Sequence, residues 1–248
     1  MQAARYDDAQ ESLRHSSGGN VTVRCLPGVL VRDARRAIEA VSPAVGLRSF
    51  DFGTEIRGPR KELEWVIDRI EGTPARHEAA PVALDCPAES YLEAVLERMK
   101  QAGVLLVAAE SCTAGLVTDT ITEVPGSSAV LWGGFVVYSN EAKIQVGVSP
   151  EIIEYHGAVS REAVIALVEA SLARTPANTA VAVSGIAGPG GGTDDKPVGT
   201  VWIAAAIRDR KVLTSRLHFP GERRAIRLLS VGACHGAVMR VAAELTEP

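Results

Sequence analysis

The chain has 248 residues and a formal net charge of −4. This length fits one large domain, or one medium domain with a small one beside it. The negative charge argues against a general polyanion-binding surface, so nucleic acid is not an expected partner. No apolar run approaches the roughly 18 residues of a membrane span, so we expect no membrane partner either. Composition therefore favours a protein that acts on small molecules.

The four cysteines are far apart in the sequence, at Cys25, Cys86, Cys112 and Cys234. They form no CxxC pair and have no histidine at metal-ligand spacing, so the sequence indicates neither a zinc site nor a disulfide framework. The first residues are polar and acidic and lack the apolar segment of a secretory signal. We therefore expect four reduced cysteines in a cytoplasmic protein.

The first third of the chain predicts a small unit that precedes the main domain. Residues 1–19 are polar and predict a mobile tail. Hydrophobic periodicity over residues 20–72 predicts a small α+β unit of βαβα order, with strands at 20–26 and 47–56 and helices at 29–41 and 60–70. Residues 73–87 contain three prolines and no periodicity, which predicts a linker.

The remainder, residues 88–248, alternates between helical and strand-like patterns. Helices are predicted at 88–102, 115–122, 140–146, 161–172 and 222–245, and strands at 104–109, 132–138, 179–184, 199–207 and 212–219. Helices interleaved with strands over this length predict a three-layer α/β/α sandwich. The adjacent final strands predict that its sheet is mixed.

A polar segment, Glu110-Ser111-Cys112-Thr113-Ala114-Gly115, lies between a predicted strand and a predicted helix. In open α/β sheets, ligands bind at the carboxyl ends of strands, and N–H groups at a helix start can hold an anion. The simpler interpretation is helix capping, because serine and threonine are common caps. The four polar residues at one strand end favour a site.

A second group of residues has the composition of a Ser/Lys hydrolase. Ser127 and Ser128 follow a Pro-Gly turn, and Tyr138 precedes Lys143 by five residues. A serine becomes a nucleophile when a nearby group accepts its proton, and a buried lysine with a lowered pKa can do so. The alternatives are an ordinary turn and a surface lysine. No histidine pattern supports a Ser-His-Asp triad.

The segment 186–200 lies between two predicted strands and is richer in glycine than a hairpin connection requires. It predicts a loop along a phosphate- or sugar-bearing ligand, with a flexible solvent loop as the alternative. Arg223 and Arg224 begin the last predicted helix. An arginine there has the geometry to pair with a phosphate, although both side chains alternatively only decorate the helix.

Six ordered motifs make the chain similar to one known family. They are residues 109–113, 125–128, 138–143, 156–160, 184–189 and 196–201. Together they resemble the CinA C-terminal domain family, the nicotinamide-nucleotide amidases, over about residues 88–245. The resemblance implies hydrolysis of the carboxamide of nicotinamide mononucleotide to the acid and ammonia, on an α/β/α fold, without a metal or cofactor. Ala114 stands where the family pattern has glycine.

On this resemblance we expect Ser128 to attack the carboxamide carbon. Lys143 in its neutral form accepts the serine proton, and Tyr138 holds or relays it. Ser127 and then Ser111 are the alternative nucleophiles, while Ser111, Thr113 or backbone N–H groups form the oxyanion hole.

The expected substrate contacts come from the same motifs: Glu110, Thr113, Ser127, Ser184, Gly185, Gly188, Thr200 and Arg223. The expected partner is a small pyridine nucleotide, bound by a homo-oligomer. The alternative function is a catalytically silent nucleotide-binding or regulatory module, related to competence and DNA-damage proteins.

Overall fold

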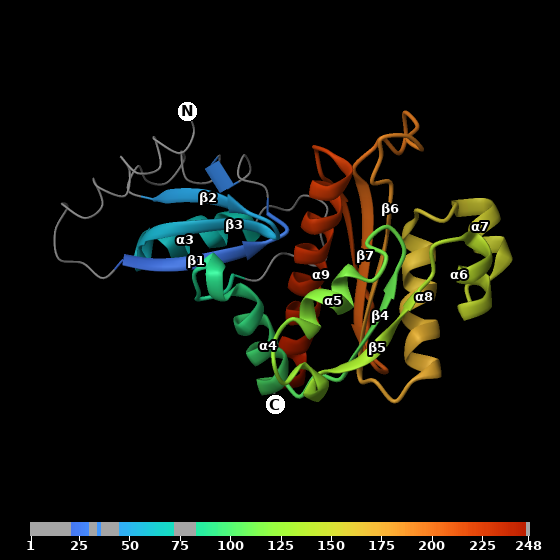
Figure 1. Cartoon of the computed structure of the whole chain (residues 1–248), viewed down its shortest axis with the longest axis horizontal. Coiled ribbons are helices and arrows are strands. Elements are labelled where there is room, and N and C mark those ends of the chain that lie inside the picture. The colour runs from blue at the N-terminus through green and yellow to red at the C-terminus, as the bar shows by residue number, and fades with distance from the viewer. Residues whose placement is uncertain (1–20, 30–33, 36–44, 72–82, 247–248) are drawn as a thin grey trace.

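The computed structural model describes residues 21–29, 34–35, 45–71 and 83–246. Two separate β-sheets are present in these ranges, and Figure 1 shows the long helix α9 (Arg223–Thr246) between them. The predicted tail, residues 1–19, lies outside the described residues, as does most of the predicted linker.

The smaller sheet is formed within residues 21–71. It is antiparallel, with strand order β1-β3-β2. This sheet and its helix are together called the N-terminal unit. Its elements are β1 (Val21–Pro27), β2 (Gly46–Phe50), β3 (Gly53–Pro59) and α3 (Arg60–Glu71). Of the helix predicted at 29–41, residues 34–35 are described, and they are helical.

The single strand predicted over residues 47–56 is wrong, because the chain reverses between β2 and β3 at Asp51 and Phe52. A glycine is needed where β3 begins: a Cβ atom on Gly53 would lie 2.2 Å from the carbonyl oxygen of Leu26. The alternating pattern continues through the turn, because Phe50, Phe52 and Ile56 all fall on every-second-residue spacing. Periodicity alone therefore does not detect this hairpin.

The larger sheet has five strands in the order β5-β4-β6-β7-β8. They are β4 (Leu106–Glu110), β5 (Leu131–Val136), β6 (Thr179–Gly185), β7 (Thr200–Ile207) and β8 (Leu213–His218). Strand β4 pairs in parallel with β5 and with β6, whereas β6–β7 and β7–β8 are antiparallel. The sheet is mixed, which confirms the prediction.

Helices cover both faces of this sheet (Figure 1). On one face lie α4 (Tyr91–Gln101), α5 (Leu116–Thr122) and α9; on the other lie α6 (Asn140–Val146), α7 (Pro150–His156) and α8 (Arg161–Arg174). Alternate residues of β4 supply the two cores: Leu106 and Ala108 belong to the first, Val107 and Ala109 to the second. The three-layer α/β/α sandwich is therefore confirmed.

Helix α9 is the central packing element. By length and composition alone its segment Arg223–Leu245 is apolar enough to cross a membrane, but most of that segment is buried inside the molecule. It packs on β6 and β7 of the larger sheet and on β1 and β3 of the N-terminal unit. Its apolar character therefore matches its position between two hydrophobic surfaces, as expected of a core helix.

Candidate active site

The carboxyl end of β4 is organised by the buried carboxylate of Glu110, which is 1% exposed. This carboxylate accepts hydrogen bonds from the N–H groups of Gly115, Val117 and Thr118 at 2.9, 3.0 and 3.0 Å. A negative charge at a helix start is stabilised by the helix dipole and by these free N–H groups. The sequence predicts Glu110 as a substrate contact; the structure places its carboxylate under the first turn of α5 instead.

The loop between β4 and α5 is held from two sides. Ala114 and Gly115 both have positive φ angles, 52° and 97°, which turn the chain back toward Glu110. From α9, Arg227 donates to the carbonyl oxygens of Cys112 and Thr113 at 3.1 and 2.6 Å. The loop is therefore fixed by contacts to its main chain.

The side chain of Lys143 lies inside this site and is 1% exposed. It comes from α6, directly after β5, whereas Ser111 follows β4. Because β4 and β5 are parallel neighbours, both residues reach the same edge of the sheet. Lys143 Nζ lies 3.1 Å from Ser111 Oγ, 2.8 Å from the carbonyl oxygen of Val137 and 3.2 Å from that of Tyr138.

The surroundings of Lys143 favour its uncharged form more than water does. Burial lowers the pKa of Lys143, and none of its three partners carries a charge. The adjacent Cys112 is a neutral thiol at pH 7, because burial raises its pKa to about 12. As an ammonium, Lys143 donates to Ser111 Oγ and to both carbonyl oxygens; as a neutral amine it keeps two N–H donors for the carbonyls and turns its lone pair toward Ser111 Oγ. In its neutral form, Lys143 is therefore within hydrogen-bond distance to accept the proton of Ser111.

The predicted pair of Ser128 with Lys143 is not formed. Ser127 and Ser128 lie in a short 3-10 helix, η2 (Ser127–Ala129), which precedes β5, whereas Lys143 follows β5. Six residues of extended strand separate the two ends by about 20 Å. Ser128 is also exposed. The structure therefore corrects the expected pairing, and brings Ser111, the predicted second alternative, to the lysine.

Tyr138 contributes its main chain to the lysine and its side chain to another part of the site. The ring is 60% exposed, and its hydroxyl accepts a hydrogen bond from Arg223 Nη2 at 3.3 Å. Arg223 Nη1 donates to the carbonyl oxygen of Gly188 at 2.9 Å. The end of β5, the glycine-rich loop and the start of α9 therefore meet here. No contact between the Tyr138 hydroxyl and Lys143 supports a proton relay among the described residues.

Other predicted site residues lie at the same end of the sheet, on β6 and β7. Ser184, 1% exposed, donates from its hydroxyl to the carbonyl oxygen of Ala158 at 2.7 Å and so fixes a neighbouring loop. A Cβ atom on Gly185 would lie 2.8 Å from Val201 Cγ2 and 3.0 Å from the carbonyl oxygen of Thr200, so glycine lets β6 and β7 approach closely here. Thr200 is buried where β7 begins.

Two further features concern polar groups near the loop. Thr113 Oγ1 is buried and has no hydrogen-bond partner among the described residues. Within the ranges that the structure describes, no cluster of three or more His, Cys, Asp or Glu side chains could hold a metal. Arg227 was not predicted from the sequence; its place four residues after Arg223, on one face of the helix, is the signal that indicates it.

Comparison with known proteins identifies the family of the larger domain. A family model described as the CinA C-terminal domain matches residues 88–241. The nicotinamide-nucleotide amidohydrolase PncC of Escherichia coli K12 is 47% identical over 136 residues, covering 54% of this chain and 82% of that protein. In a solved structure, the competence/damage inducible protein CihA from Agrobacterium tumefaciens is 38% identical, with a TM-score of 0.58, covering 64% of this chain and 95% of that one.

Some relatives are much longer than the region they share with this chain. A CinA-like protein of Mycobacterium marinum is 51% identical over 123 residues, which are 49% of this chain and 29% of that protein. The chain thus matches less than a third of that relative but most of the E. coli amidohydrolase. Because the family model matches more than half of its residues, the chain belongs to the CinA C-terminal domain family.

Proposed function

We propose that this chain hydrolyses the carboxamide of nicotinamide mononucleotide to nicotinate mononucleotide and ammonia. The observation that carries the proposal is the buried Ser111–Lys143 pair at 3.1 Å. Support for the substrate comes from the similarity to PncC of E. coli, whose name describes an amidohydrolase of nicotinamide nucleotide. The predicted cytoplasmic location and homo-oligomeric state stay predictions.

In the proposed reaction, Ser111 Oγ attacks the carboxamide carbon while Lys143 takes the hydroxyl proton. The protonated lysine then delivers this proton to the leaving nitrogen, and ammonia departs. Water then attacks the acyl-enzyme while the neutral lysine takes its proton, and the lysine returns this proton to Ser111 Oγ as the acid is released. The lowered pKa of Lys143 supports this role, because a general base works best when its pKa lies near the working pH.

The negative charge that develops on the carboxamide oxygen needs hydrogen-bond donors. Among the described residues, the N–H groups of Thr113 and Ala114 have no acceptor, and both belong to the loop that carries Ser111. We assign them as the oxyanion donors. Arg227 supports this assignment because it binds the carbonyl oxygens of Cys112 and Thr113, whose peptide planes also contain the N–H groups of Thr113 and Ala114.

The substrate phosphate is placed at the opposite side of the site. Arg223 is exposed at the start of α9 and already turns two of its donors toward Gly188 and Tyr138. A guanidinium in this position offers its remaining donors to an oxyanion. We also assign the exposed ring of Tyr138 to the face of the cationic pyridinium, where a cation–π contact is favourable.

Ammonia release from nicotinamide mononucleotide tests the proposal. The wild-type chain should release ammonia, Ser111→Ala should lose activity by many powers of ten, and Ser128→Ala should keep it. These two serine variants form a matched pair, because both remove one hydroxyl. An inactive Ser128→Ala together with an active Ser111→Ala would instead identify Ser128 as the nucleophile, as the sequence predicts. No ammonia from the wild type would favour the alternative of a catalytically silent nucleotide-binding module.

A further inference from the structure

Helix α9 contacts both the candidate site and the N-terminal unit. Arg227 holds the loop that follows β4, and His235 lies eight residues further along the helix, about 12 Å away. His235 is fully buried. One rigid element therefore connects the site to the surface on which the N-terminal unit packs.

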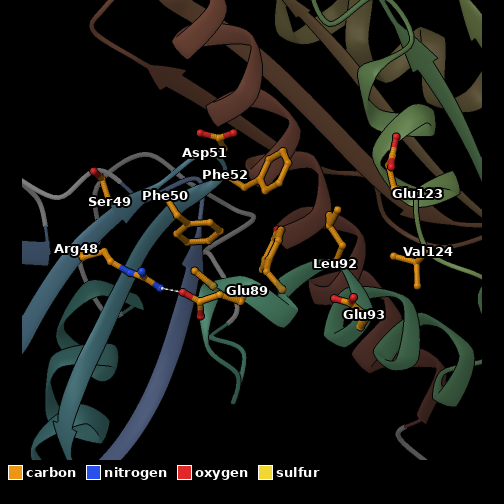
Figure 2. Close-up of a pocket in the computed structure, with 12 residues that line it drawn as sticks. Arg48, Ser49, Phe50, Asp51, Phe52, Glu89, Leu92, Glu93, Glu123 and Val124 are labelled. Carbon is orange, nitrogen blue, oxygen red and sulfur yellow. Dashed lines mark hydrogen bonds and ion pairs between the residues drawn. The ribbon is translucent and has the colours of Figure 1, made fainter.

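The N-terminal unit lies directly on this helix. A Cβ atom on Gly232 would lie 1.9 Å from the carbonyl oxygen of Phe52, and one on Gly28 would lie 2.7 Å from Ala233 Cβ. Figure 2 shows Phe52 pointing from the β2–β3 turn toward α9, beside a cavity of about 470 Å³. Such close backbone approach is typical of a fixed interface rather than of a tethered, mobile module.

His235 links three elements by hydrogen bonds. Its Nδ1 lies 3.2 Å from the hydroxyl of Tyr91, on α4, and its Nε2 lies 3.3 Å from Oγ1 of Thr120, on α5. Thr120 Oγ1 donates its single proton to the carbonyl oxygens in the first turn of α5, which lie 2.9 Å away for Leu116 and 3.1 Å away for Val117. With that proton used, we assign the tautomer in which Oγ1 accepts from Nε2–H and Nδ1 accepts from the tyrosine hydroxyl.

This chain of hydrogen bonds reaches the first turn of α5, directly after the loop that carries Ser111. Leu116 is the first residue of α5, and the neighbouring N–H groups of Gly115 and Val117 are bound by Glu110, the residue before Ser111. The other end is covered by Phe52, whose ring stacks on Tyr91 at 5.4 Å and lies 6.1 Å from the His235 ring. The N-terminal unit thus shields the buried imidazole from water.

We propose that the Tyr91–His235–Thr120 chain, covered by Phe52, positions α5 and thereby holds Ser111 against Lys143. This inference rests on the proposed function. Thr120, His235 and Phe52 are positioning residues in this account, since they act through α5 and touch neither substrate nor the reacting atoms. The N-terminal unit is then a structural part of the amidase site.

The test compares variants of α5 in the full chain. Thr120→Val keeps the shape of the side chain and removes the hydrogen bond, Thr120→Ser restores it, and Phe52→Leu removes only the aromatic cover. Thr122→Val is the matched control, because its hydroxyl donates to a helix carbonyl outside the chain of contacts. The measurements are kcat and KM for nicotinamide mononucleotide, the melting temperature, and the titration of Lys143.

The titration uses lysine labelled with ¹³C at Cε. The chain has five lysines, so Lys143 is assigned by the signal lost in Lys143→Arg. We expect Thr120→Val to lower kcat by roughly tenfold to a hundredfold, as small misplacements of reacting groups do, and to raise the pKa of Lys143 as water reaches it. Phe52→Leu should move both quantities in the same direction, while Thr120→Ser and Thr122→Val stay near the wild type.

An unchanged kcat and Lys143 titration in Thr120→Val or in Phe52→Leu would overturn the proposal, even if the melting temperature fell. If Thr120→Val does not fold, Phe52→Leu decides. Failure of the proposed function is a separate result: a wild type that releases no ammonia still shows, by its Lys143 titration in the same variants, whether the chain of contacts controls the pair.

Discussion

Lys143 Nζ lies 3.1 Å from Ser111 Oγ, although the two residues are 32 positions apart. The parallel pairing of β4 and β5 creates this contact, since the chain leaves each strand at the same edge of the sheet. Ser111 is further tied to the sheet by its N–H group, which donates to the carbonyl oxygen of Val183 in β6. Three adjacent strands therefore determine how these two side chains are placed.

The activity should depend on the neutral form of Lys143. Because burial lowers the pKa of this amine below its usual 10.5, kcat/KM should rise with pH and level off at a pH below that value. Lys143→Arg should abolish ammonia release, since a guanidinium stays protonated. The control is Lys100→Arg, an exposed lysine on α4. Normal turnover by Lys143→Arg would mean that the residue contributes only a positive charge and is not the general base.

The same lysine should reduce stability at neutral pH. Its pKa is lowered in the folded state, so between the folded value and 10.5 the unfolded chain binds more protons. The free energy of unfolding of the wild type therefore rises with pH across that window. Lys143→Met cannot titrate, so its stability relative to the wild type should be most favourable at neutral pH and should decline as the pH approaches 10.5. Guanidinium unfolding at pH 7 and 9.5 measures this, and a difference that does not change with pH would contradict it.

Ala114→Gly should stabilise the chain. Ala114 has a φ angle of 52°, a left-handed conformation that costs a non-glycine residue about 1–2 kcal/mol. The added freedom of glycine in the unfolded state costs about 0.4–1 kcal/mol. The strain is larger, so we expect a gain of roughly 0.5–1 kcal/mol in the free energy of unfolding.

Asp209→Gly is the matched control for that substitution, because Asp209 has a φ angle of 61° but aspartate tolerates this conformation better than alanine. Its gain should be smaller. Thermal or denaturant unfolding of both variants decides the point. A destabilised Ala114→Gly would show that the methyl group contributes packing that outweighs the backbone strain.

The sequence predicts the α/β/α sandwich well because its strands and helices have clear periodicity. It also places Ser111 at the end of a buried strand and Lys143 just after another. What it cannot supply is which strands are neighbours and which end of a strand faces the site. Ser128 is only 15 residues before Lys143 in the sequence, yet the two lie at opposite ends of β5.

The N-terminal unit shows a second limit of sequence patterns. The tight turn at Asp51 and Phe52 lies within a continuous alternation of apolar and polar residues, so the pattern does not reveal it. The need for glycine at Gly232 comes from the carbonyl oxygen of Phe52, which is distant in sequence. His235 and Tyr91 likewise have no local pattern that indicates a shared hydrogen bond. Contacts between distant segments determine all of these features.

The last prediction concerns Arg223 and the substrate phosphate. Arg223 is exposed, and its guanidinium is held by the carbonyl of Gly188 and the hydroxyl of Tyr138, so its direction is set before a ligand arrives. Loss of one charged hydrogen-bonded contact costs about 1.5–3 kcal/mol, or roughly tenfold to a hundredfold in affinity. Arg223→Ala should raise KM for the mononucleotide by about that factor.

The phosphate-free riboside separates phosphate binding from a general loss of function. Arg223→Ala should barely change kcat/KM for the riboside, because no phosphate is present to be lost. Arg224→Ala serves as the matched control: its side chain is also exposed in the first turn of α9, but it contacts neither Gly188 nor Tyr138. It should leave both substrates nearly unaffected. Equal losses on nucleotide and riboside in Arg223→Ala would show that this arginine supports the shape of the site and does not bind the phosphate.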